Sequence, residues 1–184
     1  MADFKNLTET KTASEEIFNG RILHLYKDTV TLPNGHSTTR ETIRHIGAVA
    51  IVALTDDNQV IVEHQYRYPL DAVITEIPAG KLDSKTEDRL DAAKRELAEE
   101  TGFTADEWIP LGDYYPAAAY CDERITMYLA RGLHRGEQKL DEDEFLNISF
   151  VKLSDLAEDI LAGRVTDGKT QAAVLKAYIM LQKA

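Results

Sequence analysis

Stretches rich in β-branched, aliphatic and aromatic residues dominate the front part of the chain, and such stretches are typical of β-strands. We expect strands at 21–32 and 38–46, joined by a Pro-Asn-Gly turn at 33–35. Asn-Gly is a strong hairpin signal because both residues tolerate a positive φ. The run 47–54 is continuously apolar, as in a strand that is buried on both faces. A turn of Asp and Asn residues follows it, so we expect residues 60–66 to return beside it as a second hairpin.

Beyond Gly80 the apolar spacing changes to that of an α-helix. Leu90, Ala93 and Leu97 stand at positions i, i+3 and i+7 and therefore share one helical face. Gly102 supplies the stop signal for this helix. Later in the chain we expect strands at 125–129 and 145–153, a helix at 155–162 with Ser154 as its N-cap, and a last helix at 171–181.

Strands at the front, with helices between and after them, predict an α+β fold, an α/β/α sandwich around a mixed β-sheet. The 184 residues suit one compact domain, and no internal repeat or low-complexity linker divides them. Residues 1–16 mix charged and polar side chains, so we expect a loosely ordered lead-in segment there.

The charge balance narrows the possible partners. The chain has 21 basic and 32 acidic residues, a formal net charge of −11, so it lacks the positive field that nucleic acids require. A small polyphosphate substrate stays possible, because a divalent cation can supply positive charge locally. The single Cys121 forms no internal disulfide, and the longest apolar run falls far short of the about 20 residues that span a bilayer. We therefore expect a cytoplasmic protein that binds neither nucleic acid nor membrane.

Three glutamates share one stripe of the predicted helix. Glu96, Glu99 and Glu100 stand at i, i+3 and i+4, near the helix C-terminus. Their mutual repulsion costs a few tenths of a kcal/mol, and the helix dipole adds about 0.3–1 kcal/mol for each. A solvated acidic face, softened by pairs with Arg95, is one explanation. The other is a hard divalent cation, Mg²⁺ or Mn²⁺, which prefers carboxylate oxygens.

The surrounding residues favour the cation. Glu87 is followed after seven residues by Arg95-Glu96, an apolar residue, Glu99-Glu100, Gly102 and a further apolar residue, and Gly80 stands upstream. This pattern resembles the box of the Nudix hydrolases. The box has five residues between its glycine and first glutamate where this chain has six, which indicates an insertion in the loop before the helix.

Four further segments resemble the ADP-ribose pyrophosphatase branch of that family: Ile43–Leu54, Gln65–Pro69, Glu76–Asp83 and Leu140–Phe145. The resemblance implies metal-dependent hydrolysis of ADP-ribose to AMP and ribose 5-phosphate, and a Nudix-type sandwich with an N-terminal β-hairpin extension. It also implies a homodimer, with residues 1–46 as the dimerisation part and 47–184 as the hydrolase domain. The alternatives are another nucleotide sugar such as GDP-mannose, or a Nudix protein that binds nucleotide sugars without cleaving them.

The candidate site residues fall into three groups. The expected metal ligands are Glu96, Glu99 and Glu100, to which the resemblance adds the Ala79 carbonyl and Glu144. By resemblance, Glu142 is the candidate general base, beside Glu99 and Glu100 as catalytic carboxylates; the acidic run around it would otherwise be a solvated loop. For the substrate we expect Arg67 as a phosphate clamp, because a guanidinium grips two phosphate oxygens, with Arg44 as a weaker candidate and Glu123 near the terminal ribose.

Residues 163–170 fit the phosphate-loop pattern G-x-x-x-x-G-K-[ST] to the letter. That loop needs a buried strand before it, and the preceding residues 154–162 have helical spacing. We therefore interpret Gly163 as a helix stop and Thr166 or Asp167 as the N-cap of the last helix. A nucleotide kinase or NTPase is disfavoured.

Overall fold

The computed structural model describes residues 4–142 and 144–183, which form two compact units. Of these residues, 4–45 and 117–123 form the first unit, and 46–116, 124–142 and 144–183 form the second. The return of 117–123 to the N-terminal strands was not predictable from local pattern. It is held by the Ile43 amide, which donates to the Tyr120 carbonyl at 2.7 Å, and by the Asp122 side chain, which accepts from the His45 amide at 2.6 Å.

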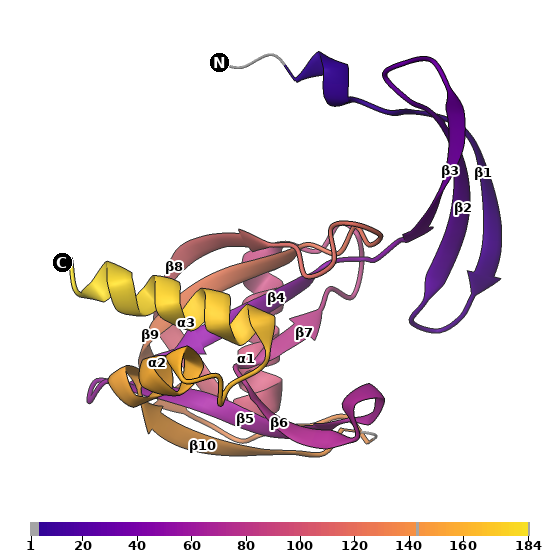
Figure 1. Cartoon of the computed structure of the whole chain (residues 1–184). Helices are drawn as coiled ribbons and strands as arrows, with labels where there is room; N and C mark the ends of the chain where they lie inside the picture. The colour runs from indigo at the N-terminus through magenta and orange to yellow at the C-terminus, as the bar shows by residue number, and fades with distance from the viewer. Residues whose placement is uncertain (1–3, 143, 184) are drawn as a thin grey trace. The chain divides into compact units, whose positions relative to one another are not determined.

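The first unit is a three-stranded antiparallel sheet in the order β1-β2-β3 (Figure 1). Its strands are β1 (Thr10–Asn19), β2 (His24–Thr31) and β3 (Ser37–Ile43). The predicted hairpin at the Asn-Gly turn is confirmed, with Gly35 at φ +84°. The loosely ordered segment expected at 1–16 is wrong from Thr10 onward, because these residues pair with β2 along its whole length.

The second unit contains two sheets. One sheet runs β7 (Ala79–Lys81), β4 (Ala48–Ala53), β9 (Ile125–Arg135), β8 (Phe103–Tyr114), with β4 and β9 parallel and the other pairs antiparallel. The other is antiparallel and runs β10 (Leu146–Lys152), β5 (Gln59–Arg67), β6 (Ala72–Glu76), with a short 3₁₀ turn (η2, Tyr68–Leu70) between the last two. The predicted mixed sheet is thus confirmed.

The second predicted hairpin is wrong. Strands β4 and β5 belong to different sheets and share only an isolated bridge between Leu54 and Val60. Every residue of β4 is buried, which suits a central strand with partners on both edges rather than one arm of a hairpin. The turn signal between the two strands was sound, but it did not specify the pairing.

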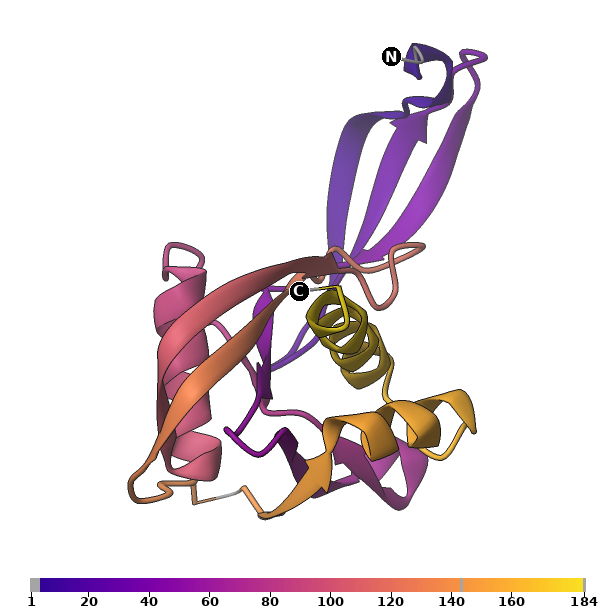
Figure 2. The same cartoon turned by 90° about the vertical axis from the view of Figure 1, so that its left-hand side faces the viewer.

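Alternate residues of β4 pack against two helices on opposite faces of its sheet, as the sandwich prediction requires. Val49 and Ile51 join the apolar cluster of α1 (Arg89–Thr101), whereas Ala50 and Val52 join that of α3 (Gly168–Leu181). Figure 2 shows α1 and α3 on the two sides of this sheet. The third α-helix, α2 (Leu153–Leu161), packs with α3, and no helix in the described ranges is long and apolar enough to cross a membrane.

Helix ends differ in detail from the sequence prediction. Helix α1 is capped by Asp88, whose side chain accepts from the Leu90 amide at 2.8 Å, and it ends at Gly102 with φ +74°. Helix α2 begins one residue before Ser154, so that residue is not its N-cap. The N-cap of α3 is Asp167, one of the two residues proposed. Strand β8 was not predicted at all.

Candidate active site

Two carboxylates one turn apart on α1 face strand β7. The Glu100 Oε2 atom accepts a hydrogen bond from the Ala79 amide at 2.9 Å. The Glu96 carboxylate lies directly against the α-carbon of Gly80, in the space that any β-carbon there would need. Only a glycine at this position leaves the Glu96 carboxylate where it is, so Ala79 and Gly80 of β7 locate both carboxylates.

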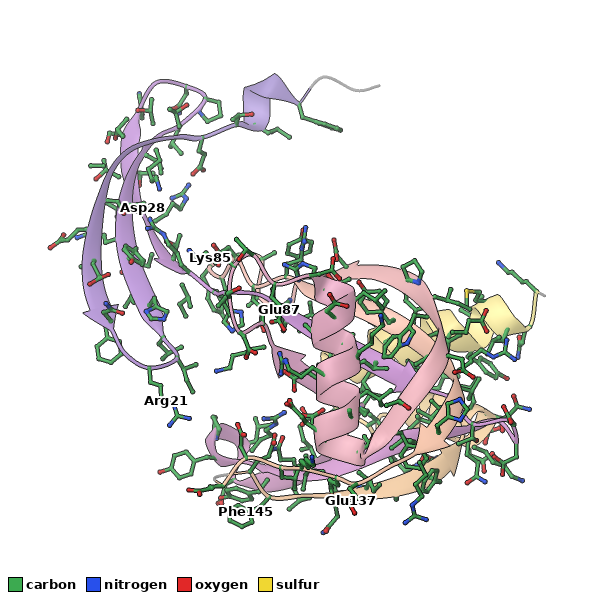
Figure 3. The ribbon with its side chains drawn as sticks, turned by 180° about the vertical axis from the view of Figure 1, so that it is seen from behind. Arg21, Asp28, Lys85, Glu87, Glu137 and Phe145 are labelled. Atoms are coloured by element: carbon green, nitrogen blue, oxygen red, sulfur yellow. The ribbon has the colours of Figure 1, made fainter. Side chains whose placement is uncertain are left out.

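Arg95 connects the helix to the loop before it. Its Nη1 donates to Glu96 Oε1 at 2.9 Å and to Glu99 Oε2 at 3.1 Å, which confirms the predicted pairing. Its Nε lies 3.3 Å from Glu87 Oε1, and the other oxygen of Glu87 accepts from the Asp83 amide at 2.5 Å. Glu87 lies at the N-terminal end of α1 (Figure 3). Through Asp83 and Arg95 it connects the helix to the loop before it, which contains the one-residue insertion relative to the Nudix box.

A second pair of buried carboxylates lies on the neighbouring strands β5 and β6, and the sequence reasoning missed both members. Glu63 and Glu76 stand directly opposite each other in the antiparallel register and are only 3% and 4% exposed. Glu76 is paired with Arg67 and Lys169, whereas Glu63 Oε1 has no hydrogen-bond partner within the described residues. The signal in the sequence was a glutamate placed directly after the apolar residues of β5.

The carboxylates of α1 and β5 influence one another. Burial raises the pKa of Glu96 to about 7, against the opposing effect of the Arg95 guanidinium. Burial, and then repulsion from Glu63 and Glu96, raise the pKa of Glu100. Burial also raises the pKa of Glu63, with repulsion from neighbouring carboxylates, including Glu144, as the next cause. Helix α1, strand β5 and the segment before β10 thus form one electrostatic cluster, in which the nearby cations do not offset the burial of the carboxylates.

The donor set suits a hard divalent cation, although the side chains are not arranged around one as they stand. No three acidic, histidine or cysteine side chains in the described ranges are grouped so that they could hold an ion. At α1 the Arg95 guanidinium already binds Glu96 and Glu99. Several buried carboxylates close together, with an orphaned oxygen on Glu63, are an environment that a dication would stabilise. The donor types present therefore fit a hard divalent cation.

Of the other predicted residues in the second unit, Glu142 is exposed and Glu144 is half-buried in the segment before β10. The Glu144 amide donates to the Asp141 carbonyl at 3.0 Å, which forms the turn there. Arg67 is half-exposed and forms an ion pair with the buried carboxylate of Glu76.

Arg44 and Glu123 belong to the first unit, where their contacts are also found. The Arg44 Nη2 lies 3.0 Å from Ser14 Oγ and 3.3 Å from Asp28 Oδ1, and its guanidinium stacks 3.6 Å above the Tyr26 ring. Glu123 lies 3.8 Å from the His45 imidazole.

The residues of the phosphate-loop pattern, 163–170, form the connection between the end of α2 and the first turn of α3. Helix α2, not a strand, comes before it, and Gly163 follows the helix end at φ +73°. Asp167 caps α3 by accepting from the Thr170 amide at 2.9 Å. The expected helix stop and N-cap are confirmed.

Comparison with known proteins covers almost the whole chain. The family model of the NUDIX domain matches residues 44–172, and that of the nucleoside diphosphate sugar hydrolase N-terminal domain matches residues 9–43. A solved structure described as an ADP compounds hydrolase superposes with a TM-score of 0.83 over 96% of both chains, at 23% sequence identity. That likeness supports the fold.

Curated relatives are similar over comparable lengths. An ADP-ribose pyrophosphatase of Bacillus subtilis (strain 168) is 41% identical over 182 residues, 98% of this chain and 97% of that protein. A methanol dehydrogenase activator of Bacillus methanolicus is 43% identical over 97% of this chain and 96% of its own. An ADP-ribose pyrophosphatase of Mycobacterium tuberculosis is 34% identical over 90% of this chain and 81% of its own. Glu96, Glu99 and Glu100 lie near the C-terminal end of α1, and the NUDIX family model matches most of the chain, so this chain belongs to the NUDIX family.

Proposed function

We propose that this chain hydrolyses the pyrophosphate bond of ADP-ribose, releasing AMP and ribose 5-phosphate. The observation that carries the proposal is the buried carboxylate cluster of α1 and β5 with Arg67, a half-exposed cation, paired at its edge. Two relatives, which match 98% and 90% of this chain, are named ADP-ribose pyrophosphatases, and this supports the choice of substrate.

The proposed metal is Mg²⁺, with Mn²⁺ as a substitute. Its ligands would come from Glu96, Glu99 and Glu100, with the Ala79 carbonyl and Glu144. When bound, such a cation polarises phosphoryl oxygens and lowers the pKa of a coordinated water. The charge it brings would also favour the ionised forms of Glu96 and Glu100, whose pKa is raised by burial and then by repulsion from neighbouring carboxylates.

The chain's own residues contribute binding and proton transfer. Arg67 holds a phosphate of the substrate through charge-assisted hydrogen bonds. Arg95 holds the side chains of Glu96 and Glu99 in place from the side of the loop. Glu142, in the exposed turn before β10, takes a proton from the attacking water as the general base. The oxygen of that water adds to phosphorus, and the bridging oxygen leaves with the departing phosphate.

The active form is proposed to be a cytoplasmic homodimer assembled through the N-terminal part, residues 1–46. The sheet of the first unit leaves large apolar side chains exposed around its first turn, including Ile17, Phe18 and Ile22. Contiguous exposed apolar residues mark interaction surfaces. Arg44 and Glu123 lie in the same unit and are proposed to contact the substrate.

A second candidate is cleavage of GDP-mannose, because a GDP-mannose pyrophosphatase of Yersinia enterocolitica is 26% identical over 84% of this chain. Binding of nucleotide sugars without cleavage is the third, and retention of every box carboxylate disfavours it.

Product analysis distinguishes these functions. The purified protein is incubated with Mg²⁺ and ADP-ribose, GDP-mannose, a dinucleotide or a nucleoside triphosphate, and the products are separated by chromatography. AMP and ribose 5-phosphate from ADP-ribose, lost in Glu100→Gln, are expected. Preference for triphosphates contradicts the proposal, and binding of a nucleotide sugar without any product supports the non-catalytic alternative.

A further inference from the structure

A buried chain of alternating charges joins the last helix to Arg67. The Lys169 ammonium lies 2.8 Å from Glu76 Oε1, and the other oxygen of Glu76 accepts from Arg67 Nε at 2.8 Å and from Nη2 at 2.6 Å. Exposure of the side chains falls from 41% at Arg67 to 11% at Lys169 and 5% at Glu76. The carboxylate thus has a buried cation on one side and a half-exposed cation on the other.

Lys169 is fixed by the start of α3. Its ammonium also lies 3.2 Å from the N-cap carboxylate of Asp167. The next residue, Thr170, accepts a hydrogen bond from the Ile77 amide at 2.9 Å, so the first turn of the helix is attached to the chain directly after Glu76. The Gly-Lys-Thr part of the phosphate-loop pattern therefore has a structural use here: it fastens α3 to the end of β6.

Among the described residues, the contacts of Arg67 lie along one edge of its guanidinium. Both of its contacts with Glu76 use the Nε and Nη2 atoms and a single carboxylate oxygen, so neither involves Nη1. A guanidinium carries five N–H donors in one plane, and fixing one edge sets the direction of the rest. Lys169 cannot take this outward role itself, because it is nearly buried and bound to two carboxylates.

We propose that Lys169 is a positioning residue for substrate binding: it fixes the Glu76 carboxylate, which in turn directs Arg67 towards a phosphate of the nucleotide sugar. The inference rests on the proposed function, since it assumes that Arg67 binds the substrate. Without Lys169, Glu76 would face the buried carboxylate of Glu63 with one cation instead of two. An under-compensated buried charge then pulls on Arg67 or moves towards water, and the orientation of the guanidinium is lost.

The test is a set of variants whose kcat, KM for ADP-ribose with Mg²⁺, and thermal midpoint Tm are measured. Lys169→Met is expected to raise KM about tenfold while kcat stays within about threefold, because the residue acts on binding. Lys176→Met is the matched control. Lys176 lies on the same helix, donates to the Leu111 carbonyl at 2.5 Å and has no link to Arg67, so its loss can lower Tm but leaves KM unchanged.

A double-mutant cycle separates positioning from a structural role. In an Arg67→Ala background, Lys169→Met should change KM less than about twofold, because the residue it directs is gone. If Lys169→Met does not fold, Lys169→Gln, which keeps a donor for Glu76 without the charge, takes its place in the same cycle. An unchanged KM in the folded Lys169 variant, or an equal rise with and without Arg67, would overturn the inference.

The two proposals fail in distinguishable ways. If Arg67→Ala raises KM but the Lys169 variants do not, the positioning role alone is wrong. If the wild-type protein cleaves no nucleotide sugar, or Arg67→Ala leaves KM unchanged, the failure lies in the proposed function.

Discussion

At the scale of single residues, Gly80 provides a direct test of the carboxylate site. A β-carbon at this position collides with the Glu96 carboxylate, the far end of a flexible side chain, so we expect Gly80→Ala to move that carboxylate rather than unfold the protein. Mutations of the residues that position metal ligands typically lower metal affinity or activity 10–100-fold. We expect a loss of kcat/KM in about this range, with little change in Tm.

Gly163→Ala is the matched control for that substitution. No atom lies within 4 Å of a β-carbon there, but the residue has φ +73°. The left-handed backbone costs about 1–2 kcal/mol for a residue with a side chain, so Tm should fall while kcat/KM is unchanged. Full activity in Gly80→Ala would contradict the proposed role of Glu96.

Glu63 predicts a pH dependence of stability in the metal-free protein. Its raised pKa means that the folded chain keeps a proton that the unfolded chain has lost. The free energy of unfolding therefore falls as pH rises from the ordinary glutamate range towards about 8, by up to about 1.4 kcal/mol per pH unit. Glu63→Gln removes this titrating group, so the slope of the unfolding free energy against pH should become less steep by up to about 1.4 kcal/mol per pH unit. Denaturant unfolding with EDTA across this range measures it.

Glu107→Gln is the comparison for that experiment, because Glu107 is an exposed strand residue whose side chain is 56% accessible. We expect its slope to match the wild type. Equal slopes in the Glu63 variant and the wild type would show that Glu63 is ionised in the folded protein at neutral pH, contrary to the environment described above.

At the scale of elements, helix α1 carries the predicted metal dependence. A ligand that binds only the folded state stabilises it by RT ln(1 + [L]/Kd), about 2.7 kcal/mol at a concentration of 100 Kd. Mg²⁺ should therefore raise the Tm of the wild-type protein by several degrees. The rise should be largely lost in Glu100→Gln and kept in Glu107→Gln. An equal rise in all three proteins would place the binding of Mg²⁺ outside α1.

The same scale explains what the sequence could predict. Helical spacing predicted that Glu96 and Glu100 share one face, and the pattern of residues around them favoured a metal site there. Their partner on the sheet, Glu63, was missed because its burial beside Glu76 depends on the register of β5 and β6, which no local pattern defines. Lys169 is 93 residues from Glu76 in sequence, and only the docking of α3 brings the two together.

Strand pairing shows the same limit. The buried run of β4 was predicted correctly from composition, but its parallel partner β9 lies more than 70 residues downstream, so adjacency in sequence suggested β5 instead. Strand β8 was missed because its residues alternate little and include Pro110 and Gly112. The bulge at these two residues accommodates both within the sheet.

At the scale of the whole molecule, the exposed apolar residues of the first unit predict its assembly. Phe18 and Ile22 are 55% and 56% exposed at the turn between β1 and β2, and every residue of β1 is exposed. Such a sheet is stabilised when a second copy covers it. We expect light scattering to give twice the 20.6 kDa of one chain, and Phe18→Ser with Ile22→Ser to shift the mass towards one chain.

Phe145→Ser separates an effect of assembly from a general loss of surface hydrophobicity. Phe145 is 80% exposed but lies in the second unit, so this variant should keep the double mass. Because Arg44 and Glu123 are proposed to reach the substrate from the first unit, the mass shift should be accompanied by a rise in KM. A wild-type protein with the mass of one chain and full activity would exclude a site shared between subunits.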